Sequence, residues 1–171
     1  MLLSVYCKNL LLVGSSTKDS GKTTFIGRVV SHFKDSFDIT CVKFRPDDSM
    51  NFPYNIIQEF DQSGSNDTSK YLMSGAKKSF YVKSKRGNYL DAFEELFSSE
   101  LLIVESNYLV KFVTPAVFIM LNSDCEKNIK ESARDFLLKA DRIVTFDKTT
   151  MSFDFDCLAL EIKNNCWKLK K

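Results

Sequence analysis

The sequence GSSTKDSGKTTFIG, from Gly14 to Gly27, carries the strongest structural signal in the chain. It follows a short apolar run, Leu10–Val13, and leads into Lys22–Phe33, where apolar residues recur at helical spacing. A strand, a polar loop with Gly-Lys-Thr and a helix, in this order, are the context of a phosphate-binding loop. The sequence therefore predicts a phosphate-binding loop between the first strand and the first helix.

The residue types in this loop suit a nucleotide with Mg²⁺. Backbone N–H groups from Thr17 to Thr23 are expected to surround the phosphates, beside the positive dipole end of the helix. Lys22 is predicted to reach the β- and γ-phosphates and to be catalytic, and the Thr23 hydroxyl to bind Mg²⁺. The predicted cofactors are Mg²⁺ and GTP or ATP. The predicted nucleotide-binding residues are Thr17, Lys18, Asp19, Ser20, Gly21, Lys22, Thr23 and Thr24.

The loop departs from the usual G-x-x-x-x-G-K-[ST] pattern at one position. Ser16 stands where that pattern has its first glycine, and the chain has Gly14 two residues earlier. Two explanations are open: the loop is longer at its start, or Ser16 adopts a positive φ at a cost of about 1–3 kcal/mol.

Apolar runs alternate with amphipathic runs along the rest of the chain. Apolar strands without polar alternation are typical of strands buried on both faces, and strand–helix alternation favours parallel βαβ units. The sequence predicts one three-layer α/β P-loop NTPase domain over residues 1–171, with a mostly parallel central sheet. Ligands of such sheets bind beyond the carboxyl ends of the strands, here after Val13, Phe44, Glu105 and Phe146.

Further elements follow from the same patterns. Strands are predicted at Phe37–Phe44, Ser79–Val82, Leu101–Glu105, Ala116–Leu121, Arg142–Phe146 and Phe153–Ile162. Helices are predicted at Asp67–Ser74, ended by Gly75, and at Tyr89–Phe97 and Glu126–Lys139. Arg45–Gln62, with two prolines, is predicted to be irregular, and the terminal WKLKK stretch to be a frayed, solvated tail.

Three carboxylates are candidates for the metal and the attacking water. Glu105 closes the apolar run LLIVE, where a Walker-B acid would hold Mg²⁺, with a surface charge at a strand end as the alternative. Asp47 and Asp48 follow the second strand and are candidate catalytic residues that position a water, with a Pro-Asp turn as the alternative. Lys43 and Arg45 beside them are expected to be solvated charges, with contact to substrate phosphates as the alternative.

The nucleotide base has a weaker signal. Asp147 and Lys148 follow a late strand, RIVTF, and could bind a base: Asp147 would accept from guanine N1 and N2, and Lys148 would lie along the base face. The full Asn-Lys-x-Asp motif is absent, so GTP and ATP both stay open.

Composition excludes several classes of protein. The 171 residues carry 24 Lys and Arg against 22 Asp and Glu, and this small excess gives no electrostatic case for nucleic-acid binding. No stretch reaches the ~20 apolar residues of a membrane helix. The five widely spaced cysteines are typical of buried thiols in a reducing compartment. We expect a cytoplasmic protein with no membrane partner.

The motif VGSSTKDSGKTT resembles the opening of MobB, the molybdopterin-guanine dinucleotide biosynthesis protein B, within the SIMIBI class of P-loop proteins. NDTSKYLMSGAKKSFYV (Asn66–Val82) and LLIVESNYL are similar to further segments of that family, so the resemblance covers roughly the first 110 residues. Three details differ: KFRPDDS has no histidine, Ser106 follows Glu105, and Ser74-Gly75-Ala76 replaces Ala-Gly-Ala. The resemblance implies a slowly hydrolysing nucleotide-binding domain, often dimeric, that acts beside a partner enzyme. It carries over Lys22, Thr23 and Glu105 in the roles above, and Asp67 as a site residue.

Three functions remain open from the sequence. The first is Mg²⁺-dependent purine nucleoside triphosphate binding with slow γ-phosphate hydrolysis, as in a MobB-like accessory protein. The second is a small-molecule kinase or ATP-dependent ligase of the dethiobiotin synthetase type, with the Arg45–Gln62 region as its acceptor pocket. The third is a non-catalytic adaptor that binds nucleotide to fix its own shape or its partner.

Overall fold

The computed structural model describes residues 5–97, 100–123 and 131–170. Its helices are α1 (Lys22–Phe33), α2 (Asp67–Met73), α3 (Tyr89–Leu96) and α4 (Glu131–Leu137), with 3₁₀ turns η1 (Arg86–Asn88), η2 (Leu109–Lys111) and η3 (Cys157–Ala159). Its strands are β1 (Val5–Ser15), β2 (Ile39–Pro46), β3 (Tyr54–Glu59), β4 (Lys78–Ser84), β5 (Leu101–Glu105), β6 (Val113–Ser123), β7 (Arg142–Asp147), β8 (Ser152–Phe153), β9 (Leu160–Lys163) and β10 (Cys166–Leu169). Within these residues, every helix is too short or too polar to span a bilayer.

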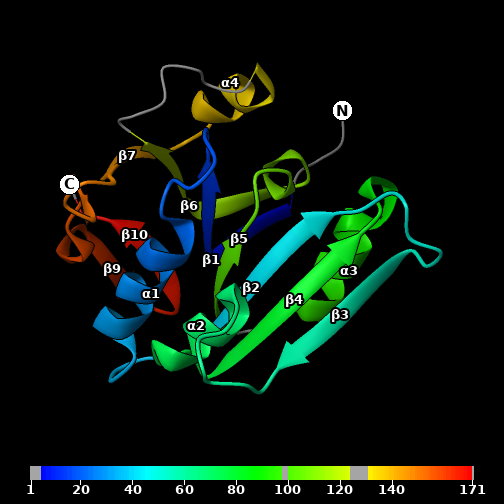
Figure 1. Ribbon diagram of the computed structural model, residues 1–171, viewed down its shortest axis with the longest axis horizontal. Coiled ribbons are helices and arrows are strands. Elements are labelled where there is room, and N and C mark those ends of the chain that lie inside the picture. The colour runs from blue at the N-terminus through cyan, green and yellow to red at the C-terminus, as the bar shows by residue number, and fades with distance from the viewer. Residues whose placement is uncertain (1–4, 98–99, 124–130, 171) are drawn as a thin grey trace.

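One twisted sheet of eight strands organises the molecule, in the order β3-β4-β2-β5-β1-β6-β7-β8 (Figure 1). The six inner strands pair in parallel, and β3 and β8 pair antiparallel at the two edges. β9 and β10 form a separate antiparallel hairpin. The predicted mostly parallel α/β sheet is confirmed.

The sheet is buried on both faces, as its apolar strands require. In β1, Leu11 and Val13 face a core shared with α1, α2 and the β9–β10 hairpin, where Trp167 is fully buried. Leu10 and Leu12 face the opposite core, shared with α3, η2 and α4. Successive side chains of a strand point to opposite faces, so one short apolar run supplies both cores.

Local sequence signals place the helix starts near the carboxyl end of the sheet. α1 has the predicted bounds, and Gly21 precedes it in a left-handed conformation with φ 74°. α2 starts at a capping box, in which the Asn66 side chain accepts from the Ser69 N–H and the Ser69 hydroxyl binds the Asn66 N–H. Gly75 follows α2 with φ 108°, so the glycine at this turn has a conformational reason.

The prediction of an irregular Arg45–Gln62 segment is wrong in part. Tyr54–Glu59 forms edge strand β3, paired with β4 from Tyr54↔Ser84 to Glu59↔Ser79. Because an edge strand is half exposed, its sequence YNIIQE mixes apolar and polar residues and lacks the continuous apolar run of the inner strands.

The predicted carboxyl-terminal elements also need correction. Phe153–Ile162 is not one strand: it is divided among β8, η3 and β9, and the Asp156 carboxylate accepts from the Leu158 N–H at the turn. The WKLKK tail begins inside β10, and Asn164 and Asn165, both with positive φ, connect β9 to β10. Two such residues are what a tight type I′ hairpin turn needs. Part of the predicted helix Glu126–Lys139 lies outside the described residues; α4 covers Glu131–Leu137.

Candidate functional site

The Gly-Lys-Thr loop connects β1 to α1 at the carboxyl end of the sheet. Gly21 has a positive φ and lies next to the ring of Phe146. A Cβ added to Gly21 would lie 2.9 Å from that ring. Asp19 also has a positive φ of 52°. The first helical N–H to be bonded is that of Phe25, which donates to the Gly21 carbonyl at 2.8 Å. The N–H groups of the first turn before it have no helical partner and are available to an anion.

Both explanations offered for Ser16 are wrong. β1 continues to Ser15, and Ser16 does not adopt a positive φ. Its N–H donates to the Leu121 carbonyl at 2.9 Å, and its hydroxyl donates to Asn122 Oδ1 at 2.9 Å. These bonds hold Ser16 against the end of β6, so this position needs no glycine.

Lys22 crosses the mouth of the loop. Its Nζ donates to Ser15 Oγ at 2.9 Å and lies 3.7 Å from Glu105 Oε1. The backbone of Ser15 is fixed by Asn107, whose side-chain amide accepts from the Ser15 N–H and donates to the Ser15 carbonyl, both at 2.7 Å. The ammonium group is therefore held at the carboxyl ends of β1 and β5.

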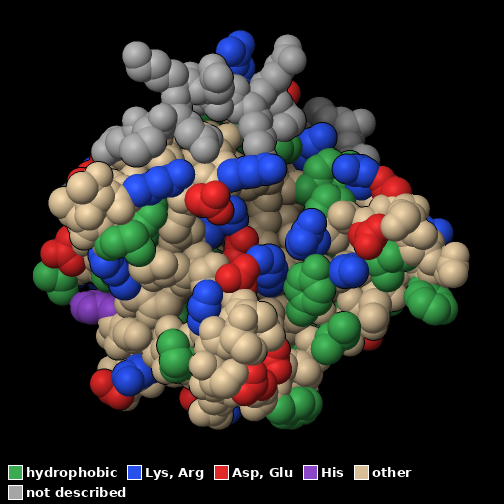
Figure 2. All heavy atoms as spheres, in the orientation of Figure 1, with side chains coloured by type: hydrophobic (Ala, Val, Ile, Leu, Met, Phe, Trp, Pro, Cys, Tyr) green, Lys and Arg blue, Asp and Glu red, His purple; other side chains and the backbone are tan. Residues whose placement is uncertain are grey.

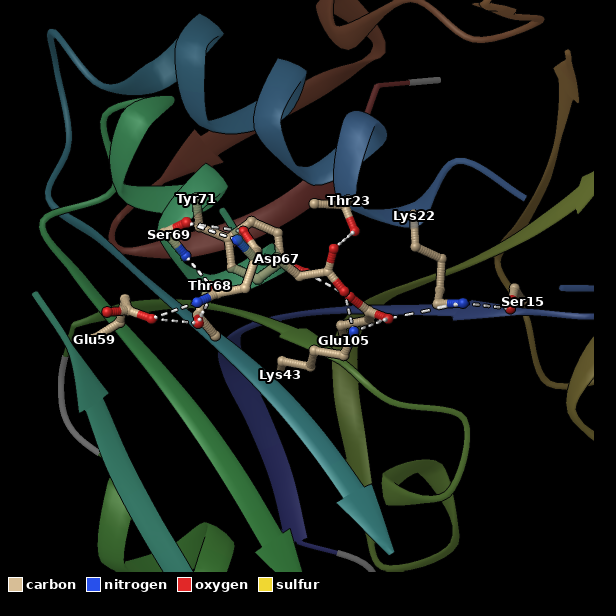
Figure 3. A network of polar contacts seen from close by, with 11 residues as sticks. Ser15, Lys22, Thr23, Lys43, Glu59, Asp67, Thr68, Ser69, Tyr71 and Glu105 are labelled. Carbon is tan, nitrogen blue, oxygen red and sulfur yellow. Dashed lines mark hydrogen bonds and ion pairs between the residues drawn. The ribbon is translucent and has the colours of Figure 1, made fainter. Parts of the chain in front are cut away.

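Four charged or polar side chains form a continuous network beside Lys22 (Figure 3). Thr23 Oγ1 donates to Asp67 Oδ1 at 2.9 Å, and Lys43 forms an ion pair with the other oxygen of Asp67. Lys43 Nζ also lies 4.0 Å from Glu105 Oε1, since Lys43 and Glu105 are register partners on β2 and β5. The network joins the start of α1, the start of α2 and two sheet strands.

Glu105 is the most enclosed acid of this network. Glu105 is 7% exposed, and the Tyr71 hydroxyl donates to Glu105 Oε2. Burial and then the adjacent Glu105 carboxylate raise the pKa of Tyr71 well above its usual value, so Tyr71 stays a hydrogen-bond donor. Burial acts to raise the pKa of Asp67, but the hydrogen bonds from Lys43 and Thr23 outweigh it and hold that pKa below its usual range.

Two buried hydroxyls in the loop have no hydrogen-bond partner among the residues that the structure describes. Thr17 Oγ1 and Ser20 Oγ belong to residues that are 2% and 1% exposed. A buried unpaired hydroxyl costs roughly 1–3 kcal/mol, so natural proteins rarely retain one without a reason. A phosphate oxygen in the loop is an acceptor that both donors could use.

The network opens into two adjoining polar cavities. One, of 500 Å³, lies between the loop, the ends of β2 and β5, and Asn107. The other, of 410 Å³, lies between the loop, Asp67 and Phe146. Lys22, Lys43 and Glu105 line both cavities. Figure 2 shows basic and acidic side chains gathered around a hollow in the middle of this face.

The oxygen donors of this site fit a Mg²⁺ ion. Mg²⁺ prefers hard oxygen ligands, and it usually takes one or two from protein carboxylates while phosphate and water supply the rest. The Thr23 hydroxyl and the Asp67 carboxylate already lie in hydrogen-bond contact, and the Glu105 carboxylate lies on the far side of Lys43. In this structure the Lys43 ammonium group neutralises the Asp67 carboxylate. The same carboxylate would also stabilise a Mg²⁺ ion.

Asp47 and Asp48 lie just beyond the end of β2, but they bind other partners. The Asp47 carboxylate accepts from the Ser49 hydroxyl, and its Oδ2 lies 3.7 Å from Lys83 Nζ. Asp48 forms an ion pair with Arg86. Neither residue is among those lining the two cavities at the loop. Their water-positioning role remains a prediction.

Asp147 and Lys148 lie at the end of β7, directly after the Phe146 ring that covers Gly21. The Asp147 carboxylate accepts from the Thr149 N–H at 2.7 Å and from the Thr150 hydroxyl at 2.7 Å. These bonds hold the Asp147 carboxylate in the turn that follows β7. Base recognition by Asp147 and Lys148 remains a prediction.

Sequence reasoning missed the role of Lys43, which was expected to be a solvated charge. Its ion pair with Asp67 depends on the pairing of β2 with β5 and on the position of α2, which no local pattern reports. Asn107 was missed as well. Its position two residues after Glu105, at the carboxyl end of a central strand, was a usable signal.

No family model matches the sequence, and no curated protein matches it either. Among solved structures, the chain is similar to the crystal structure of the "apo" form of LpxK from Aquifex aeolicus in complex with ATP. The TM-score is 0.55 at 18% identity, over 84% of this chain and 50% of that chain. This chain therefore spans about half the length of the LpxK chain it matches.

At this identity the likeness concerns the fold. The parallel sheet, with its Gly-Lys-Thr loop at the junction of β1 and α1, is a P-loop NTPase fold. The sequence resemblance to P-loop proteins implies the same fold.

Proposed function

We propose that this chain binds a purine nucleoside triphosphate with Mg²⁺ and slowly hydrolyses its γ-phosphate. The observation that carries this proposal is the meeting of Lys22 and Thr23 with Glu105 and Asp67 at the carboxyl end of the sheet. The unpartnered hydroxyls of Thr17 and Ser20 in the same loop support a phosphate ligand. The ATP bound to the similar LpxK structure also supports it.

Each side chain has a defined task in this proposal. The loop N–H groups and Lys22 hold the β- and γ-phosphates and stabilise the charge that develops on the γ-phosphoryl group. Thr23, Asp67 and Glu105 would hold Mg²⁺, which would neutralise phosphate charge. Tyr71 fixes the Glu105 carboxylate through its hydroxyl, and Asn107 fixes Ser15 and through it Lys22.

The nucleoside portion has room next to the loop. A groove of 1120 Å³ begins at Thr23 and Thr24 and runs along α1 to Phe153–Cys157. Phe153 and Arg28 line it, and the Arg28 guanidinium lies 5.0 Å from the centre of the Phe153 ring. An aromatic ring and a guanidinium are suitable stacking partners for a purine base. Recognition of guanine by Asp147 and Lys148 is a separate proposal that rests on the sequence.

A second function, phosphoryl transfer to a small-molecule acceptor as in a kinase, is favoured by one observation, the pocket on the far side of Lys43. In this alternative an acceptor oxygen forms a bond to the γ-phosphorus while the bond to the β,γ-bridging oxygen breaks. The nucleoside diphosphate leaves, and the acceptor proton passes to water.

The MobB-like role, a partner enzyme and a homodimer remain proposals that rest on the sequence resemblance. The non-catalytic adaptor is the alternative without turnover.

Release of inorganic phosphate from ATP and from GTP, each with Mg²⁺, tests the proposed hydrolysis. We expect a parent rate on the order of 10⁻⁴–10⁻² s⁻¹, as for unassisted P-loop hydrolysis. Lys22→Ala is expected to lower this rate by roughly 100-fold or more, because it removes a charge that stabilises the transition state.

Lys168→Ala is a matched control, because Lys168 is an exposed lysine on β10. It should keep the parent rate. Equal rates in the parent and Lys22→Ala would overturn the proposal of hydrolysis at this loop. Tight nucleotide binding without phosphate release would favour the adaptor.

A further inference from the structure

A third pocket adjoins the phosphate site across the Lys43–Asp67 ion pair. Its volume is 330 Å³, and it lies between the β3–β4 hairpin, the end of β2 and the start of α2. Lys43 and Arg45 line both this pocket and the 500 Å³ cavity at the loop. Figure 3 shows Asp67 between Lys22 on one side and Thr68 with Glu59 on the other. A molecule in this pocket would be a neighbour of the γ-phosphate.

The charges of the pocket leave one cation available. Glu59 is satisfied by four donors, among them the Asn66 amide at 3.1 Å and the Thr68 hydroxyl at 3.0 Å. Lys43 is paired with Asp67. The backbone of Arg45 is paired with β4, but its side chain has no hydrogen bond or ion pair to any other residue that the structure describes. An unpaired guanidinium at a pocket wall suits bidentate binding of a carboxylate or phosphate.

The other wall is less polar. Tyr81 and Ile57 are register partners on β4 and β3, and both line the pocket. Ile57 is 50% exposed, so its side chain is accessible to a ligand in the pocket. An aromatic and an aliphatic side chain can cover the flat or apolar body of a ligand.

We infer that this pocket binds a second small molecule, one that has an anionic group for Arg45 and a ring or apolar body for Tyr81 and Ile57. The inference rests on the proposed function, because it names the class of molecule that would lie beside the bound nucleotide. Carboxylate and phosphate share the chemistry that Arg45 recognises.

A ligand-observed NMR titration tests the inference. Phenyl phosphate and, in a separate arm, benzoate are added to the protein saturated with MgADP. We expect saturable binding in at least one arm, and the stronger arm identifies the anion. Arg45→Gln should weaken it roughly 10-fold, the effect of losing one charge-assisted hydrogen bond. Ile57→Trp, which fills the pocket from an exposed strand position, should weaken it at least as much.

Arg142→Gln is the matched control, since Arg142 is an exposed arginine at the start of β7 and does not line the pocket. It should bind the probe as the parent does. Absence of saturable binding in both arms, or equal weakening by Arg45→Gln and Arg142→Gln, would overturn the inference. MgADP is titrated first: a parent that fails to bind it overturns the proposed function and this inference together, whereas MgADP binding without probe binding overturns this inference alone.

Discussion

At the scale of single residues, Glu105 shows how a buried acid is accommodated in this site. A carboxylate that is 7% exposed needs partners, because an unpaired buried charge is strongly destabilising. Lys22, Lys43 and the Tyr71 hydroxyl supply them. The two ammonium groups belong to different elements, so the acid holds the phosphate loop and β2 at a fixed separation.

Gly21 is the residue whose backbone most restricts substitution. It has a φ of 74°, and the Phe146 ring occupies the place of a side chain. Gly21→Ala is expected to lower the free energy of unfolding by about 1–3 kcal/mol, because alanine is strained at this φ and would displace the ring. Urea denaturation measures this. Gly87→Ala, at a glycine with no atom within 4 Å of an added Cβ, should change it by much less. Equal effects at the two glycines would contradict the role of the Phe146 contact.

Asp67 predicts a pH dependence of stability. Its pKa is lower in the folded protein than its ordinary value of about 3.9, because the bonds from Lys43 and Thr23 outweigh its burial. It therefore stabilises the fold above about pH 4, and this stabilisation is lost as the pH falls through the folded-state pKa. Urea denaturation from pH 6 to pH 3 should give a shallower fall in stability for Asp67→Asn than for the parent. Parallel profiles would contradict the account of Asp67.

At the scale of elements, α2 is short and depends on its cap. Its seven residues are too few to be stable alone, and the Asn66 side chain accepts from the Ser69 N–H and the Thr68 hydroxyl. Asn66→Ala is expected to lower the free energy of unfolding by about 0.5–2 kcal/mol. Because Asp67 is the first residue of α2, the same change is expected to make nucleotide binding less dependent on Mg²⁺. Asn88→Ala is the control, because Asn88 precedes α3 without a side-chain cap bond. Equal losses in the two variants would contradict a special role for the α2 cap.

Elements were predictable where one local pattern determines them. The bounds of α1 and β5 were predicted without error, because both combine a distinct apolar pattern with a clear end signal. β3 and β10 were missed, and β9 was predicted only as the end of a longer strand, because their stability comes from pairing and packing rather than from a local apolar run. The position of Glu105 at a strand end was predicted for the same reason as β5. The pairing of Lys43 with Asp67 and Glu105 was not, because three separate elements must meet to create it.

At the scale of the whole molecule, the carboxyl-terminal hairpin completes one of the two cores. Trp167 on β10 is 1% exposed and packs edge-on against Phe33 of α1, with ring centres 5.5 Å apart. Trp167→Ala is expected to lower the free energy of unfolding by about 3–5 kcal/mol.

Trp167→Phe should cost less, because it keeps an aromatic ring and removes an indole N–H that has no partner in the described part of the chain. Thermal and urea denaturation of both variants measure the difference. A loss below about 1 kcal/mol for Trp167→Ala would mean that the hairpin is not part of the folding unit.

Isothermal titration of MgATP and MgGTP into the parent and into Lys22→Ala tests the claim that the loop residues Thr17 to Thr24 bind nucleotide phosphates. We predict that at least one nucleotide binds the parent and that Lys22→Ala weakens it roughly 10- to 100-fold, as expected for the loss of charge-assisted hydrogen bonds. The tighter nucleotide identifies the preferred base. Absence of binding to the parent, or equal affinities in the parent and Lys22→Ala, would contradict the claim.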